Sequence, residues 1–254
     1  MNSLKEKLKA NKQTLGSWIT LPDTAICEIM TKAGFDWLTV DMEHSAITLH
    51  QAQELIRVVE LGGCVPLVRV GKNDPNLIKR VMDAGAHGVI VPMVNCREDA
   101  ISAVSSVKYP PHGKRGVGLA RAQGYGLTFE KYREWVSSES VVIVQIEHID
   151  AIKNLEVILE VEGVDASMIG PYDLSASLGY PGDFKKKEIV DAIKKYTDIC
   201  DKLKKPGGFH VIEPEAEKLK DRLKEGFKFM AFSFDALFLG NKIKEELEGV
   251  KGLR

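Results

Sequence analysis

The feature that most constrains the fold of this chain is a regular alternation along almost its whole length. Eight short runs of β-branched and other apolar residues alternate with eight longer amphipathic segments, and no Pro/Gly/Ser linker divides the series. The short runs predict buried parallel strands, and the longer segments predict helices that cover them. We expect strands at residues 15–20, 36–41, 64–70, 88–92, 141–147, 165–170, 206–211 and 228–233. We expect helices at residues 23–33, 48–60, 75–84, 97–107, 151–160, 186–203, 214–225 and 235–248.

Signals at the segment boundaries support the expected helices. Asp74 stands before Pro75, which suits the first turn of a helix, and Gly34, Gly62 and Gly85 follow segments that glycine commonly ends. Eight such units close most naturally into an α/β fold, a (β/α)₈ TIM barrel. We expect one domain over residues 1–254, with 1–13 as an N-terminal helical extension. An open doubly wound sheet is the alternative, and no G-x-G-x-x-G follows the first strand to favour a dinucleotide-binding version of it.

The composition argues against several classes of partner. The chain has 35 basic and 36 acidic residues, and no segment concentrates arginine with aromatic residues, so nucleic acid is not expected as a partner. The stretch 1–13 is too charged for a signal peptide, and no apolar run approaches the length of a membrane span. The four cysteines lack C-x-x-C or zinc-ligand spacing, which indicates free thiols in a reducing compartment. We therefore expect a cytoplasmic protein with no membrane partner.

Two acidic residues follow neighbouring predicted strands. Glu147 ends the run 141–147, and Asp173 comes shortly after the run 165–170. Because the active site of a barrel lies at the C-terminal ends of its strands, these carboxylates would lie side by side on one rim. Paired oxygen ligands suit a hard divalent cation such as Mg²⁺ or Mn²⁺ that keeps positions open for water or a chelating substrate. The alternative is that Glu147 is a plain rim acid and Asp173 the N-cap of the next helix.

Two further strand ends carry side chains that could take part in catalysis. His44 lies within a cluster of acids, where a carboxylate could orient its ring for proton exchange, although a lone histidine is also commonly structural. Arg69 follows an apolar run, and its guanidinium could grip a carboxylate or stabilise an enolate, or form a structural pair with Asp41 or Glu43. No lysine stands at the tip of a core strand, so metal-assisted chemistry is favoured over imine chemistry.

The connection at residues 108–140 is too long for a plain link in a compact barrel. It is rich in glycine and carries the basic residues Lys114, Arg115 and Arg121. Such a loop could fold over an anionic ligand, form a subunit contact, or simply be extended.

A set of motifs, taken together, resembles a known family. The chain resembles the metal-dependent class II pyruvate aldolases, which include 4-hydroxy-2-oxoheptanedioate aldolase and 2-dehydro-3-deoxyglucarate aldolase. The motifs run in the family's order over nearly the full chain and lie at Asp41–His44, Pro66–Arg69, Val91–Met93, Tyr109–Pro111 with Arg115–Gly118, Val144–Glu147 and Ile169–Tyr180.

The resemblance implies an architecture and a set of roles. It implies a (β/α)₈ barrel whose last helix is exchanged between neighbours in a homohexamer, a dimer of trimers. The metal, Mg²⁺, Mn²⁺ or Co²⁺, would be bound by Glu147 and Asp173. Arg69 would stabilise the pyruvate enolate, and His44 would transfer protons with Asp83 as its carboxylate partner. The implied substrate-binding residues are Trp18, Gln145, Gly170, Pro171, Leu174 and Arg121.

The implied reaction is the reversible retro-aldol cleavage of a 4-hydroxy-2-keto acid to pyruvate and an aldehyde through a metal-bound enolate. The substrate would be a 2-keto-3-deoxy sugar acid or a compound of the 4-hydroxy-2-oxoheptanedioate type. Two alternatives are an acyl-CoA thioester lyase of the related citrate-lyase branch and a catalytically silent barrel that binds a keto acid. The near-neutral composition offers no clear support for a basic surface that would bind CoA phosphates. A silent barrel would be expected to lack one or more of Glu147, Asp173, Arg69 and His44, and all four are present.

Two strand ends depart from the family pattern. The seventh predicted strand ends in Phe209-His210, which is bulkier and more polar than the aliphatic ending expected from the resemblance. The eighth carries Phe232, Ser233 and Phe234 where small residues are usual. These departures change residues that would select the aldehyde, so the family pattern does not predict which aldehyde this chain uses.

Overall fold

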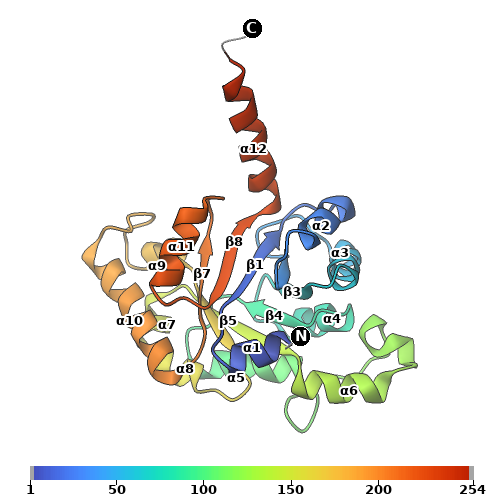
Figure 1. Ribbon diagram of the computed structural model, residues 1–254. Helices are drawn as coiled ribbons and strands as arrows, with labels where there is room; N and C mark the ends of the chain where they lie inside the picture. The colour runs from blue at the N-terminus through green and yellow to red at the C-terminus, as the bar shows by residue number, and fades with distance from the viewer. Residues whose placement is uncertain (1–2, 252–254) are drawn as a thin grey trace.

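The computed structural model describes residues 3–251 and confirms the closed barrel (Figure 1). Every strand is parallel to its neighbours, and the last strand pairs with the first. Each strand begins and ends within one residue of its predicted run. They are β1 (Thr14–Ile19), β2 (Trp37–Asp41), β3 (Val65–Arg69), β4 (Gly88–Val91), β5 (Val141–Ile146), β6 (Ala166–Ile169), β7 (Gly207–Val211) and β8 (Phe229–Phe234).

Helices surround the barrel on its outer side (Figure 1). Those that correspond to predicted segments are α2 (Thr24–Thr31), α3 (Leu49–Leu61), α4 (Pro75–Asp83), α5 (Arg97–Val107), α7 (Ile149–Lys153), α8 (Leu155–Leu159), α10 (Lys187–Leu203), α11 (Ala216–Lys224) and α12 (Asp235–Gly249). The predicted helix 151–160 is two helices, because the backbone at Asn154 leaves the helical conformation. An N-terminal helix, α1 (Leu4–Lys9), precedes the barrel.

Two helices and one 3₁₀ segment were not predicted. They are η1 (Arg121–Gly126), α6 (Phe129–Ser138) and α9 (Pro171–Ser177). α9 is too short to show a helical period in the sequence, whereas α6 buries only Tyr132 and Val136. Among the described residues, no helix combines the length and the apolar character that crossing a membrane requires.

The two-residue period of the strands creates two separate cores. Outward side chains pack beneath the helices, while inward ones fill the barrel, where the Trp37 and Phe229 rings stack with their centroids 4.3 Å apart. Gly16 makes room for this pair, since a Cβ there would come within 2.1 Å of the Trp37 ring. Leu4 and Leu8 of α1 belong to the same interior cluster. The N-terminal end of the barrel is therefore filled by a packed core and is not a channel.

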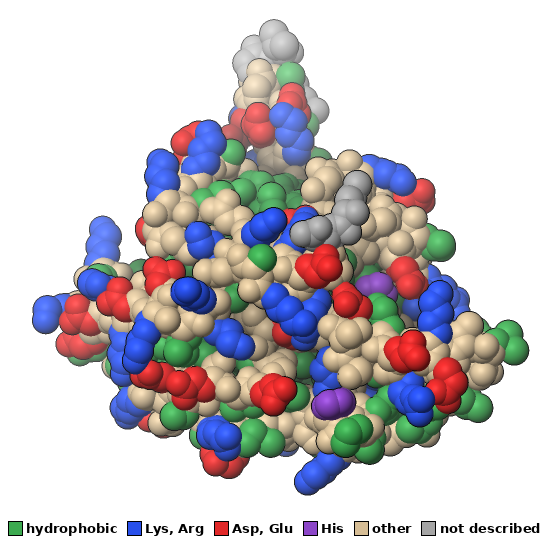
Figure 2. Space-filling model, turned by 60° about the horizontal axis from the view of Figure 1, so that its bottom comes forward, with side chains coloured by type: hydrophobic (Ala, Val, Ile, Leu, Met, Phe, Trp, Pro, Cys, Tyr) green, Lys and Arg blue, Asp and Glu red, His purple; other side chains and the backbone are tan. Residues whose placement is uncertain are grey.

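The long connection folds away from the C-terminal ends of the strands. Arg115 is buried and binds Asp83 at 2.6 Å and the Tyr132 hydroxyl at 2.9 Å. Lys108 donates to the carbonyl oxygens of Val136 and Ser137 at the end of α6. Figure 2 shows basic and acidic side chains interspersed over the face of the molecule that it draws. This segment consequently packs near the ends of α3 and α4, and does not cover the mouth of the barrel.

Candidate active site

At the C-terminal ends of the strands, the inward positions change from apolar to polar. β2 and β3 pair in a register that sets Asp41 beside Arg69. The Arg69 guanidinium donates from Nε to Asp41 Oδ1 at 2.9 Å and from its terminal nitrogen to Oδ2 at 2.6 Å. Its Cζ lies 4.3 Å from the centre of the Trp18 ring. A bidentate ion pair and an aromatic face together fix the plane of the guanidinium.

Asp41 is the charged anchor of this arrangement. Burial pushes the pKa of its carboxyl group upward, but the hydrogen bonds and charge of Arg69, with two backbone N–H groups, outweigh burial and leave the pKa below its ordinary value. Asp41 therefore stays ionised and keeps Arg69 oriented. The structural pairing considered for Arg69 in the sequence analysis is thus present, and it leaves the arginine at the cavity.

Glu147 lies just past β5 and is only 4% exposed. Its Oε1 accepts a hydrogen bond from the Met93 backbone N–H at 2.7 Å, and its Oε2 accepts one from the Gln145 amide. Burial raises the pKa of the Glu147 carboxyl group, and the charge of Asp173 adds to the increase, while the hydrogen bonds and Arg69 oppose it. Hydrogen bonds therefore fix the position of the Glu147 carboxylate, but the nearby positive charge does not offset the cost of burying its negative charge.

Asp173 lies in the first turn of α9, after Gly170 and Pro171. The N-cap of α9 is Gly170, so the alternative that Asp173 serves as the cap is not observed. Its side chain is exposed, and the structure gives it no ion pair within residues 3–251. Gly170 leaves open the space beside Glu147, because a Cβ there would lie 3.0 Å from Glu147 Oε2.

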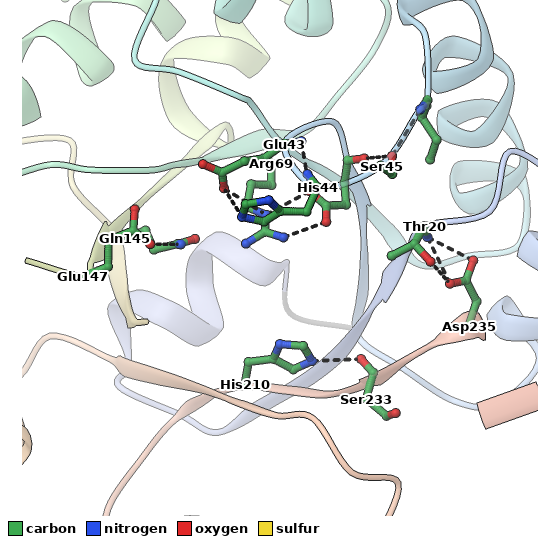
Figure 3. Close-up of polar contacts among 12 residues, drawn as sticks. Thr20, Glu43, His44, Ser45, Arg69, Gln145, Glu147, His210, Ser233 and Asp235 are labelled. Atoms are coloured by element: carbon green, nitrogen blue, oxygen red, sulfur yellow. Dashed lines mark hydrogen bonds and ion pairs between the residues drawn. The ribbon is translucent and has the colours of Figure 1, made fainter. Parts of the chain in front are cut away.

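Arg69, Gln145 and Asp173 line a cavity of about 210 Å³, and Glu147 lies behind Gln145, to which it is hydrogen-bonded. Figure 3 shows Arg69, Gln145 and Glu147 on one side of the opening and His210 on the other. The backbone of α9 closes the rim, whereas the Leu174 side chain is fully buried in the outer core. The cavity is lined by Trp18, His44, Arg69, Gln145, Met168, Ile169, Gly170, Pro171, Tyr172, Asp173, His210 and Ile212.

The donor set at this cavity is compatible with a hard cation. Glu147 and Asp173 supply carboxylate oxygens, and the buried Gln145 Oε1 has no hydrogen-bond partner among residues 3–251. Within the described residues, His, Cys, Asp and Glu side chains form no group of three or more that could hold a metal ion. A cation bound here would therefore have two carboxylate ligands, with its other positions open to water or substrate.

His44 lines the same cavity but is not paired with Asp83. Its Nε2 lies 3.7 Å from Glu43 Oε2, and its side chain is 65% exposed. Asp83 binds Arg115 and the Gln123 amide at the end of α4, before β4 begins. Helices of a barrel run opposite to its strands, so Asp83 and His44 are at opposite ends within one chain. The expected His44–Asp83 contact is absent from the described residues.

Arg121 is likewise not brought to the cavity. Its guanidinium binds Glu60 at the end of α3 and the Ala84 carbonyl oxygen at 3.1 Å. The expectation that Arg121 binds the substrate of its own chain is corrected by this placement. Arg115 and Arg121 are thus held at the far end of the barrel, where they bind the carboxylates of Asp83 and Glu60 and carbonyl oxygens at the ends of helices.

Two positions that matter to the cavity were not predicted as site residues. Met93 adopts a left-handed backbone conformation, φ 53°, which aims its N–H at Glu147. Such strain in a residue other than glycine is common at functional sites. His210 faces the cavity from β7. Its signal in the sequence is the alternation Gly208, His210, which places both residues on the inward face of the strand.

Comparison with known proteins relates the chain to one family. A family model described as HpcH/HpaI aldolase/citrate lyase matches residues 14–241. The 2-dehydro-3,6-dideoxy-6-sulfogluconate aldolase of Pseudomonas putida is 37% identical over 246 residues, which cover 96% of this chain and 95% of that protein. The pyruvate aldolase of Rhizobium etli is 38% identical over 240 residues, covering 94% of this chain and 93% of that protein.

The fold has close counterparts among solved structures. A protein from Burkholderia cenocepacia, described as a member of the same aldolase/citrate lyase family, superposes with a TM-score of 0.93. The alignment covers 99% of this chain and 100% of the other, at 28% sequence identity.

Proposed function

Because the chain belongs to the HpcH/HpaI aldolase/citrate lyase family, we propose that it acts as a metal-dependent pyruvate aldolase. The chain is a carbon–carbon lyase of the aldolase type, as the family resemblance in its motifs indicated. The reaction is the reversible cleavage of a 4-hydroxy-2-keto acid into pyruvate and an aldehyde. Its partners are small molecules.

One observation carries the proposal. The oriented Arg69 guanidinium, the Gln145 amide and the Asp173 carboxylate line one cavity at the C-terminal mouth of the barrel, and the Glu147 carboxylate adjoins it through its hydrogen bond with Gln145. An enolate-forming reaction needs a negatively charged oxygen to be stabilised as it develops. The same arrangement would bind a 2-keto acid before the reaction and the enolate of pyruvate after it.

The residues present fit a divalent metal ion. Glu147 and Asp173 would hold it, and Gly170 keeps the space beside Glu147 open. When bound, such an ion withdraws electrons from the keto group of a chelating 2-keto acid. Mg²⁺, Mn²⁺ and Co²⁺ are the candidates.

Besides the metal ligands, the protein supplies two polar side chains that would contact the substrate, Arg69 and Gln145. Arg69, held by Asp41, would donate hydrogen bonds to the enolate oxygen. Gln145 would position pyruvate, and the backbone N–H groups of Tyr172 and Asp173, which lie between Gly170 and Leu174, would bind its carboxylate. Trp18 would support Arg69 and line the pyruvate side of the cavity.

His44 is the candidate for proton transfer. It lines the cavity and is largely exposed, so it can exchange protons with water. In the cleavage direction it would remove the proton from the 4-hydroxyl group, directly or through water, and return a proton in synthesis. We propose Glu43 as the carboxylate that orients it, since Glu43 is its acidic neighbour in the structure.

We further propose an assembly in which α12 is exchanged between subunits of a homohexamer built from trimers. Figure 1 shows α12 projecting away from its own barrel. Leu239, Ile243 and Leu247 are each about half exposed, and a helix with such a stripe ordinarily buries it.

The free thiols Cys27, Cys64, Cys96 and Cys200 support a reducing, cytoplasmic location.

The decisive experiment is proton exchange at C3 of pyruvate in D₂O, followed by NMR. It requires no knowledge of the aldehyde. Protein treated with a chelator should be inactive, and Mg²⁺, Mn²⁺ or Co²⁺ should restore exchange. Glu147→Ala should abolish the metal-dependent exchange without loss of fold. Folded wild-type protein that fails to exchange with any of these metals would overturn the proposal.

A further inference from the structure

One side of the cavity has no role in the chemistry proposed above. His210 lies on β7, opposite Arg69, Gln145 and Glu147 (Figure 3). Because Phe209 and Val211 point into the outer core, the alternation of the strand turns His210 inward. The residue below it on the same face is Gly208, whose Cβ would meet backbone oxygens at 2.6 and 2.7 Å. His210 is therefore the first inward side chain that β7 can offer.

The hydrogen bond of His210 settles which ring nitrogen carries the proton. Nε2 lies 3.2 Å from the Ser233 carbonyl oxygen, which can only accept, so Nε2 is the donor. Ser233 has a left-handed backbone, φ 49°, and the same carbonyl oxygen accepts from the Ser17 hydroxyl at 3.1 Å. The acceptor is thus built into the junction of β1 and β8. A neutral imidazole with Nε2 protonated leaves Nδ1 as an acceptor.

The surroundings keep the ring neutral. Burial lowers the pKa of His210 to about 4, and the charge of Arg69 acts in the same direction, while the bond to Ser233 and the charges of Asp41 and Glu213 oppose them. The Trp18 ring lies between the two basic groups, 5.5 Å from the His210 ring and 4.3 Å from Arg69 Cζ. Figure 3 shows Nδ1 on the side of the ring that faces Arg69. No side chain of the described residues donates a hydrogen bond to it.

His210 also stands where two cavities meet. It lines the cavity of about 210 Å³ that contains Arg69 and Gln145, and a neighbouring one of about 700 Å³ between α10 and α11. Pro171, Tyr172 and Ile212 line both cavities as well. A substrate whose keto-acid end lies by Glu147 and Arg69 would extend its aldehyde end toward this junction. Nδ1 would then meet the aldehyde half of the molecule.

We propose that His210 is a specificity-determining residue, whose Nδ1 accepts a hydrogen bond from a hydroxyl group on the aldehyde half of the substrate. The substrate class is a 2-keto-3-deoxy acid formed from pyruvate and a hydroxyaldehyde. This inference rests on the proposed aldolase function and adds the selection of the aldehyde. An aldehyde with only hydrogen or alkyl groups at that position leaves Nδ1 without a donor.

A pair of aldehydes that differ by one hydroxyl group tests the inference. Condensation with pyruvate is measured with lactaldehyde and with propionaldehyde, and kcat/KM is compared for wild type, His210→Phe and His210→Gln. Wild type should prefer lactaldehyde by about fivefold, the effect expected of one neutral hydrogen bond. His210→Phe keeps a ring but has no acceptor, so the preference should vanish. His210→Gln supplies a carbonyl acceptor and should retain part of it.

Two controls separate the possible failures. His112→Phe makes the same change on an exposed loop residue and should leave the preference unchanged. Exchange at C3 of pyruvate needs no aldehyde, and it should persist in His210→Phe; His210→Leu replaces that variant if it does not fold. Absence of exchange in wild type would overturn the proposed function itself. Normal exchange with equal rates for the two aldehydes in wild type, or an unchanged preference in His210→Phe, would overturn only the role of His210.

Discussion

Arg69 is oriented by a buried carboxylate and by an aromatic ring. Asp41 holds two of its nitrogens, and Trp18 supports the face of the guanidinium. The lowered pKa of Asp41 means that this anchor remains ionised through the neutral range. The position of Arg69 therefore depends on the register between β2 and β3 and on a buried charge.

We predict that Arg69→Lys reduces pyruvate exchange by about 100-fold, because an ammonium cannot reproduce the planar, bidentate fork. Asp41→Asn should reduce it by about tenfold, since the guanidinium loses its charged anchor. Exchange at saturating metal measures both effects. Arg57→Lys, in a partly exposed pair with Glu54 on α3, is the matched control. Near-normal exchange in Arg69→Lys would remove this residue from enolate stabilisation.

Gly170 gives a second prediction at the scale of one residue. A Cβ at this position would come within 2.9 Å of Glu147 Cβ and 3.0 Å of Oε2. Gly170→Ala should displace the carboxylate and lower metal-dependent exchange by about 10- to 100-fold, with an unchanged circular dichroism spectrum. Gly116→Ala, whose Cβ would approach only Lys79 at 4.0 Å, serves as the control. Full exchange in Gly170→Ala would show that the Glu147 position is not critical.

At the scale of elements, the long connection between β4 and β5 is built around a buried lysine. Lys108 follows α5, and its ammonium binds carbonyl oxygens at the end of α6 together with the Ser140 hydroxyl. Cations stabilise the C-terminal end of a helix, where carbonyl groups lack partners. The lysine thus joins α5, α6 and the start of β5, and this explains why the connection packs against the barrel.

Because Lys108 is buried, we predict that the free energy of unfolding depends on pH. Burial lowers the pKa of Lys108 from 10.5 to about 8, and the nearby Lys5 contributes to the shift. Between these values the unfolded state binds more protons than the folded state, so this group makes the protein more stable as the pH rises. Below about pH 8 both states are protonated, and the cost of burying the charge is present in full.

Urea unfolding of wild type and Lys108→Met between pH 7 and 10.5 measures this effect. The free energy of unfolding of wild type, relative to the variant, should rise by on the order of 1–3 kcal/mol across the upper part of the range. Lys131→Met removes an exposed lysine from α6 and should show no such trend. A constant difference between wild type and Lys108→Met would mean that the buried ammonium does not titrate in this window.

At the scale of the whole molecule, α12 is the element that its own barrel leaves uncovered. It extends from the end of β8, and only Asp235 in its first turn is buried. That residue ties the helix to the barrel by accepting hydrogen bonds from the Thr20 and Leu21 backbone N–H groups. The base of the helix is fixed, while its apolar stripe remains available to a neighbouring subunit.

We predict that Ile243→Glu combined with Leu247→Glu lowers the molar mass measured by light scattering coupled to size-exclusion chromatography. Two charges on the apolar stripe would oppose its burial in a partner. Lys244→Glu makes the same change in net charge at a neighbouring position off the stripe and should leave the mass unchanged. An unaltered mass for the double variant would argue against exchange of α12.

The sequence by itself determined the barrel, because alternating buried strands and amphipathic helices leave few other ways to cover a parallel sheet. It also indicated Arg69, Gln145, Glu147 and Asp173 as neighbours, since strand ends in a closed barrel share one rim. Motifs that follow the order of a family named the class of reaction, which no single residue could have done.

Only the tertiary structure decided which distant groups meet. The family resemblance implied that Asp83 pairs with His44 and that Arg121 binds the substrate, but helix direction and the folding of residues 108–140 carry both to the other end of the barrel. The Met93 N–H reaches Glu147 through a strained backbone, and the bond between His210 and Ser233 depends on how β7 and β8 are staggered. Such contacts arise from backbone geometry and packing between elements, which local sequence patterns do not encode.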